Sequence, residues 1–185
     1  MNNMIEQCKR LSIISEIVKR KPDIGKTAIM KYIFLLQRVY KVPLEYNYEI
    51  YTYGPYSSEV MEDIDYARHE NVVSMTTVQY PSGYYGYNLN STEKTDEYIY
   101  RESQFVSLYS ESIKKIIDMF GDKSVKELEL STTIIYIFNT YIENNWSYSI
   151  NTISENVHEI KPHFDKKTIE KEYKHLKELG LLKIS

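Results

Sequence analysis

The sequence predicts a mainly helical fold of the α+β class. We expect a winged-helix-like N-terminal unit with a β-hairpin wing, followed by a helical, helix-turn-helix-like C-terminal unit. Apolar residues recur at helical spacing over most of the chain, and one segment has the pattern of a hairpin. The 185 residues can bury the core of one domain or of two small abutting ones. The expected boundaries are 1–90 for the first unit and 91–185 for the second, either as packed units or as one continuous domain.

The N-terminal half carries three helical stripes of apolar residues and then two β-rich runs. Its predicted elements are helices over 4–20, 24–40 and 57–70 and a hairpin over 72–89. Asp23 is expected to cap the second helix, and the alternation of Tyr46, Tyr48 and Ile50 predicts a short strand before the third. Three helices followed by a hairpin is the element order of a winged helix, so the hairpin would be the wing.

The C-terminal half is defined by its helix caps. Residues Ser124–Glu127 and Thr152–Glu155 each match a capping box, and Asp165 matches a simple N-cap. The predicted elements are helices over 93–99, 104–120, 125–143, 152–160 and 165–179, and a closing strand over 181–184. The helix over 125–143 is apolar nearly all round, which predicts a central, buried position.

The Tyr53-Gly54-Pro55-Tyr56-Ser57 segment is the stretch that packing explains least well. Gly-Pro is expected to end the strand before it, and Ser57 or Ser58 can accept a hydrogen bond from the free N–H groups of the next helix. Tyrosine, which accounts for 19 of the 185 residues, is dense here and in the hairpin. Aromatic rings of this kind anchor protein interfaces at low entropic cost, although they also serve as β-formers and core fillers. The predicted protein-binding surface comprises Tyr53, Gly54, Pro55, Tyr56, Ser57, Tyr84 and Tyr85.

Charge is unevenly distributed along the chain. The net charge is +5 over residues 1–45, −8 over 46–130 and 0 over 131–185. Five carboxylates on the third helix would be repelled by a phosphate backbone, so the N-terminal unit is not expected to read DNA. The alternative nucleic-acid surface lies in the C-terminal unit and comprises Lys161, Lys166, Lys167, Lys171 and Lys174. Interleaved glutamates leave open that this is an ordinary solvated surface.

The sequence contains no convincing motif for catalysis, cofactor binding or metal binding. Gly25-Lys26-Thr27 lacks the preceding glycine and strand of a phosphate-binding loop, and the four histidines are too scattered for a zinc pattern. We therefore expect no catalytic residue, no cofactor and no metal, with a hydrolase or nuclease as the least favoured class. Lone Cys8 and the lack of a long apolar run indicate a cytoplasmic protein without a membrane partner.

Four motifs carry a resemblance to a known family. They are Lys31-Tyr32-Ile33-Phe34-Leu35-Leu36-Gln37, Tyr53-Gly54-Pro55-Tyr56-Ser57, Glu127-Leu128-Glu129-Leu130-Ser131-Thr132 and Lys161-Pro162-His163-Phe164. Together they resemble the YwgA-like family of small bacterial and archaeal proteins, and residues 30 to about 70 are similar to the Panacea-type antitoxin domain. The resemblance implies a winged-helix-like fold and a role in regulation or in conflict with mobile elements or phage.

The sequence thus favours a non-enzymatic, antitoxin-like interaction or regulatory module that binds a protein partner. The alternative is a DNA-binding winged-helix or helix-turn-helix transcriptional regulator that uses the C-terminal lysines. A homodimer is compatible with both functions. The DNA-binding alternative favours it, because one short basic helix offers few contacts to DNA.

Overall fold

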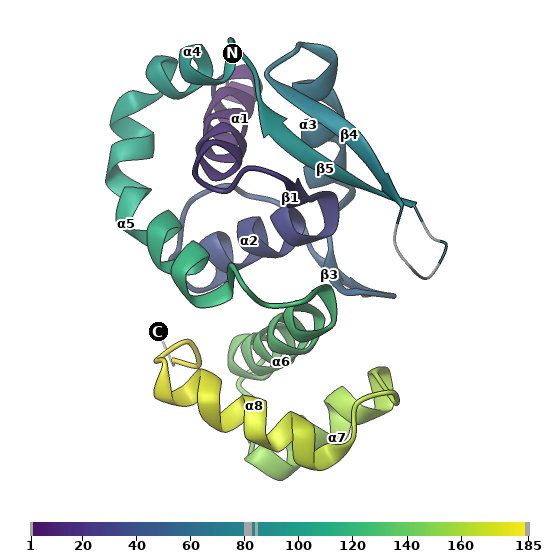
Figure 1. Cartoon of the computed structure of the whole chain (residues 1–185). Helices are drawn as coiled ribbons and strands as arrows, with labels where there is room; N and C mark the ends of the chain where they lie inside the picture. Colours follow the sequence, from purple (N-terminus) through teal and green to yellow (C-terminus); the bar gives the residue numbers. More distant parts are fainter. Residues whose placement is uncertain (1, 80–82, 84, 184–185) are drawn as a thin grey trace. The chain divides into compact units, whose positions relative to one another are not determined.

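The computed structural model describes residues 2–79, 83 and 85–183, and this part of the chain is mainly helical, with eight helices and five short strands (Figure 1). The contacts within the chain divide it into two compact units. The first consists of Met1–Asn47 and Ser57–Asp122, and the second of Tyr48–Tyr56 and Lys123–Ser185. This division differs from the expected boundary at residue 90, because the helices after the hairpin belong to the first unit and a short insert joins the second.

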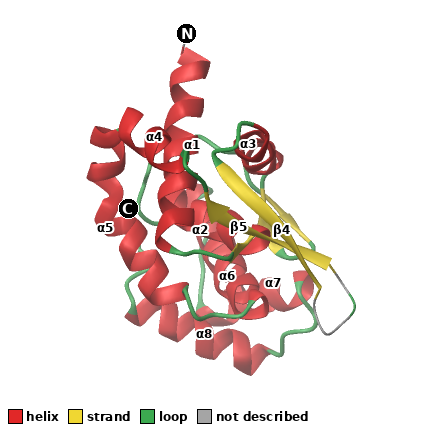
Figure 2. Cartoon of the chain, turned by 45° about the horizontal axis from the view of Figure 1, so that its top comes forward, coloured by secondary structure: helices red, strands yellow, loops and turns green. Residues whose placement is uncertain are grey.

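The first unit is a helical body with a three-stranded antiparallel sheet, whose strands run in the order β1-β5-β4. Its elements are α1 (Asn2–Arg20), β1 (Ile24–Gly25), α2 (Lys26–Arg38), α3 (Ser58–His69), β4 (Val73–Gln79), β5 (Tyr85–Ser91), α4 (Thr95–Arg101) and α5 (Ser103–Phe120). The hairpin of β4 and β5 reaches beyond the helices α1–α3 of its own unit (Figures 1 and 2). The core consists of apolar side chains from the helices and from the base of the hairpin, among them Ile14, Phe34, Leu36, Ile64 and Leu89.

One buried carboxylate, that of Asp63 on α3, lies within this core. It accepts a hydrogen bond of 2.7 Å from the hydroxyl of Tyr46, and Arg10 lies 4.0 Å from it. The Arg10 guanidinium also stacks over the Tyr46 ring and donates to the backbone oxygens of Leu44 and Glu45. Burial outweighs these favourable contacts and raises the pKa of Asp63 above its ordinary value.

The second unit packs a small hairpin and three helices together. Its elements are β2 (Glu49–Tyr51), β3 (Gly54–Tyr56), α6 (Val125–Glu143), α7 (Ile150–Ile160) and α8 (Lys166–Glu178). Helix α6 is exposed over its first three residues and buried without interruption from Leu128 to Ile135, and this buried run agrees with its apolar composition. The two strands of the hairpin are antiparallel, with Tyr51 paired to Gly54 across a two-residue turn.

Most helices begin and end within two residues of the predicted bounds. The prediction of a mainly helical fold with a small sheet is confirmed. The capping box of Ser124 and Glu127 and the caps of Ser57 and Asp165 are also present. Within the described residues, no helix combines the length and the apolarity that a membrane span requires.

Four local predictions are wrong. Strand β2 does end before Gly54, but Gly54 and Pro55 are not the break itself, because they form the next strand, β3, in which Gly54 pairs with Tyr51. Gly25, not Asp23, precedes α2, and Ser149 caps α7 by accepting a hydrogen bond from the N–H of Thr152. Residues 181–183 form no strand, and the remainder of that predicted strand lies outside the described residues.

The raised pKa of Asp63 predicts a pH-dependent contribution to stability. Because the folded state holds the Asp63 proton to a higher pH than the unfolded chain does, this residue favours folding most below the unfolded pKa of about 4. Its contribution then decreases as the pH rises through the folded pKa. In denaturant titrations between about pH 3.5 and pH 7, the unfolding free energy of wild type minus that of Asp63→Asn should therefore fall with increasing pH.

Glu62→Gln controls for the loss of one carboxylate, because Glu62 is exposed on the same helix. A difference between wild type and Asp63→Asn that stays constant over this range would contradict the assignment.

Candidate functional site

The tip of the β2–β3 hairpin exposes two tyrosines. Tyr51 is 62% and Tyr53 59% exposed, whereas Gly54 and Pro55 are buried beneath them. Tyr56 is half-buried, and its ring lies 5.6 Å from that of Tyr51, centroid to centroid. The exposed aromatic surface of this segment therefore comes from Tyr51 and Tyr53, and Tyr51 was not among the residues expected from the sequence.

Gly54 is required by both its backbone and its neighbours. Its φ of +87° lies in the left-handed region that side chains rarely adopt. A Cβ at this position would lie 3.0 Å from Oγ1 of Thr133 and 3.4 Å from the backbone oxygen of Glu129, both on α6. The hairpin can therefore lie directly on α6 because this residue has no side chain.

Lys161 anchors the hairpin from below. This residue follows α7, is 4% exposed, and donates hydrogen bonds of 2.6 Å and 2.5 Å to the backbone oxygens of Tyr51 and Thr52. Its ammonium also lies 3.1 Å from Oε1 of the buried Glu129. The ammonium of Lys161 donates its hydrogen bonds to the two backbone oxygens. Its contact with Oε1 of Glu129 is an ion pair that lacks hydrogen-bond geometry.

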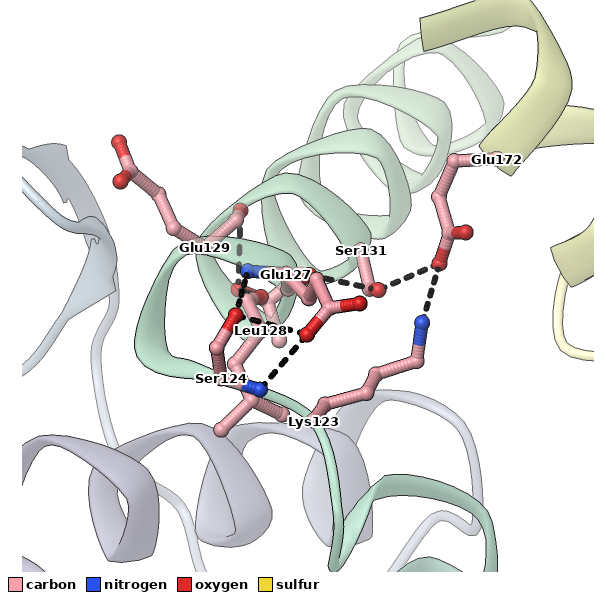
Figure 3. A network of polar contacts seen from close by, with 8 residues as sticks. Lys123, Ser124, Glu127, Leu128, Glu129, Ser131 and Glu172 are labelled. Carbon is pink, nitrogen blue, oxygen red and sulfur yellow. Dashed lines mark hydrogen bonds and ion pairs between the residues drawn. The ribbon is translucent and has the colours of Figure 1, made fainter. Parts of the chain in front are cut away.

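Glu129 connects α6 to the loop between α7 and α8. Its Oε1 atom lies 3.4 Å from Nε2 of His163, which is half-exposed. Figure 3 shows its side chain on the opposite side of α6 from that of Glu172. Three of the four motifs quoted for the family resemblance thus meet at one place, which we call the hairpin anchor and define as Gly54, Pro55, Glu129, Lys161 and His163.

The assignment of Lys161 to a nucleic-acid surface therefore needs correction. Its ammonium is buried and is engaged by the hairpin, so it is not available to a phosphate group. One sequence signal could have found this role, because Lys161 continues the apolar stripe of Ile153 and Val157 at a spacing of four. A charged residue on such a stripe indicates a buried cation that needs a partner.

A second polar network lies on the side of α6 opposite to the Glu129 side chain (Figure 3). Oε1 of Glu172 on α8 lies 3.1 Å from Nζ of Lys123 and accepts a hydrogen bond of 2.5 Å from Ser131. At the start of α6, the side chain of Ser124 accepts from the N–H of Glu127, while Glu127 accepts from the N–H of Ser124. The hydrogen bonds from Ser124 lower the pKa of Glu127, which keeps this cap charged.

The remaining predicted lysines lie on or beside the exposed face of α8. Lys166 is ion-paired with Glu155 at 3.3 Å. A shallow depression along the helix is lined by charges of both signs, namely Lys123, Lys167, Glu170, Lys171, Glu172, Lys174, His175 and Glu178. This face therefore carries mixed charge rather than a continuous basic strip.

The other residues of the predicted protein-binding surface belong to different parts of the fold. Ser57 is buried in the first unit, where its hydroxyl accepts from the N–H of Val60 at 3.4 Å. Tyr85 is exposed on β5 of the same unit, and Tyr84 lies outside the described residues. Tyr53 and Tyr56 belong to the second unit. Among the described residues, no three His, Cys, Asp or Glu side chains are grouped as they would be to hold a metal ion.

Removal of the Lys161 ammonium should destabilise the fold strongly. Lys161→Met leaves the Glu129 carboxylate buried beside two unsatisfied carbonyls, and breaking a buried ion pair in this way costs about 3–5 kcal/mol. Chemical denaturation should show this loss in the unfolding free energy. Lys166→Met is the control, because this exposed pair contributes about 0–1 kcal/mol. The double variant Lys161→Met with Glu129→Leu should recover part of the loss, and equal costs for Lys161→Met and Lys166→Met would contradict the role of the anchor.

Comparisons with known proteins identify no related protein. No protein-family model, curated protein or solved structure matches the chain. The resemblance to the YwgA-like family stays a prediction, and the candidate site is defined by its geometry alone.

Proposed function

We propose that this chain is a non-enzymatic interaction module that binds a protein partner through the tip of the β2–β3 hairpin. One observation carries the proposal. Two tyrosines, Tyr51 and Tyr53, are more than half exposed on a turn whose backbone is held by the buried ammonium of Lys161. We call these two residues the aromatic tip.

The anchored backbone makes the tip suited to binding. A large exposed aromatic surface gives a free chain no stability, whereas tyrosine is among the residues that contribute most at interfaces. Binding is weakened by the entropy lost when a loop becomes ordered. Here the hydrogen bonds from Lys161 and the packing of Gly54 on α6 limit that loss, since the turn is already held before a partner arrives.

The chemistry around the tip favours a protein over a nucleic acid. Aromatic rings that stack on bases usually lie in a positively charged groove, which tracks the phosphates. Along the hairpin the single ionisable residue besides the tyrosines is Glu49, which is exposed and negative. The nearby Lys161 is already neutralised by Glu129, so the tip offers rings without cations.

We further propose that the first unit is a winged-helix module in a regulatory, antitoxin-like protein. The element order α1-β1-α2-α3-β4-β5 and the strand order β1-β5-β4 support the first part. The acidic helix α3 supports a role other than DNA reading for this unit. Glu62 is exposed there, and Asp65 is already paired with Lys26 at 2.7 Å.

Substitution of the aromatic tip tests the main proposal. Tyr51→Ala with Tyr53→Ala should abolish capture of the partner from extracts of the native cells, because both rings of the tip are lost. The thermal midpoint should stay within about 3 °C of wild type, since exposed rings add little to the core. Tyr100→Ala is the matched control, because Tyr100 is 80% exposed in the first unit.

Quantitative mass spectrometry of the captured proteins gives the comparison. If the same proteins are recovered with the double variant as with wild type, the aromatic tip is not the binding surface.

A DNA-binding regulator remains the second candidate, because Lys167, Lys171 and Lys174 are all exposed on α8. If each neutralised one phosphate, the log–log slope of affinity against salt would be about −2.7. We expect instead no specific binding tighter than about 1 μM at physiological salt, because glutamates dilute this face. Fluorescence titration of duplex DNA provides the measurement. Nanomolar, sequence-dependent binding that is lost on changing all three lysines to Glu would favour the regulator.

A further inference from the structure

We propose that two copies of this chain associate by pairing their β4 strands, antiparallel and about a two-fold axis through Thr76. The resulting continuous sheet would join the hairpins of both copies. Strand β4 and the aromatic tip share no residue, and the inference does not depend on the proposed function.

Strand β4 is the outer strand of its sheet. The strand order β1-β5-β4 leaves one edge of β4 without a neighbouring strand in the described part of the first unit. All seven residues of β4 pair with β5 on the other side, so the strand is regular and has no bulge. Thr76, Thr77 and Gln79 are exposed. A regular edge of this length presents unpaired N–H and C=O groups that can accept another strand.

The usual protection of such an edge is missing. Natural edge strands are commonly guarded by lysines, inward-pointing charges, prolines or bulges. Between Glu70 and Glu93 no residue is charged, and this is the longest uncharged stretch of a chain in which 26% of residues are charged. Strand β4 itself contains neither charge nor proline, and four of its seven residues are Val or Thr, which favour strands.

Symmetry explains why a second copy fits this edge. In an antiparallel pair about a two-fold axis, the residue on the axis faces its own copy and its neighbours face one another. Any charge near the axis would therefore meet the same charge at short distance, which destabilises strand pairing. An uncharged strand avoids this penalty, and β4 contains no charge that would select a peptide of opposite charge.

The strand length selects the register. An axis through Thr76, the central residue of Val73–Gln79, pairs all seven residues of each copy. Thr76 then faces Thr76 of the second copy, which is a favourable cross-strand pair. Val73 faces Gln79, and Met75 faces Thr77, so no apolar side chain is placed opposite a charge.

A charge exchange at position 76 tests the pairing. Sedimentation velocity should show a dimer for wild type. Thr76→Lys and Thr76→Glu should each raise the dissociation constant about tenfold, because like charges about 5 Å apart then face each other. An equimolar mixture of the two variants should restore dimerisation, since Lys now faces Glu. Gln79→Lys is the matched control, because positions 79 of the two copies would lie about 20 Å apart, beyond the screening length.

A second measurement covers the case in which either charged variant fails to fold. Thr76→Cys in a Cys8→Ala background should form an intermolecular disulfide under mild oxidation, since directly opposed residues have Cα atoms about 4.5–5.5 Å apart. Gln79→Cys in the same background should not. The proposal is overturned if wild type is monomeric at about 1 mM, if Gln79→Lys weakens association as much as Thr76→Lys does, or if the Thr76→Cys variant does not crosslink. Tyr51 and Tyr53 are unchanged throughout, so partner binding by the aromatic tip is measured independently.

Discussion

The buried ammonium of Lys161 is the interaction on which the second unit depends. A lysine taken out of water must find polar partners within the protein, and Lys161 finds two backbone oxygens and one carboxylate. These partners are Tyr51, Thr52 and Glu129, which come from the insert 48–56 and from α6. One side chain therefore holds together segments that are about 110 residues apart in the sequence. It also explains why a hairpin of two three-residue strands can keep a defined shape, although such a hairpin is unstable alone.

The parts that could be predicted from the sequence are those with local causes. Helix α6 has its own cap in Ser124 and Glu127 and its own apolar composition, so its bounds follow from neighbouring residues. The role of Lys161 could not be derived in this way, because its partners are distant in the sequence and a lysine beside a turn usually faces solvent. Local signals can also compete. Ser149 and Thr152 both suit a cap, and the structure uses the one that lies three residues earlier.

The two proposed surfaces differ in how they are supported. The aromatic tip depends on a buried charge beneath it, whereas β4 is distinguished by the absence of charge along its edge. Some charges of the second unit are engaged by neighbouring groups. Glu172 is held by Lys123 and Ser131, and the glutamates of α8 lie among its lysines. The number of lysines on a surface is therefore a weak guide to binding here, as the mixed charge along α8 shows.

The insert 48–56 also changes what the two units are as parts of a chain. The backbone passes from the first unit to the second at residue 47, returns at 57, and passes again at 122. The two units are consequently not consecutive domains, since cleavage of the backbone at any single position cannot give two fragments that each contain one whole unit. A fragment ending at residue 122 would carry the two strands of the hairpin without the helix and lysine that support them, and the remaining fragment would keep Lys161 and Glu129 but lose the two backbone oxygens to which Lys161 donates. The second unit therefore cannot complete its fold until the chain has been synthesised beyond residues 57–122 of the first unit, because its own residues lie on both sides of that segment.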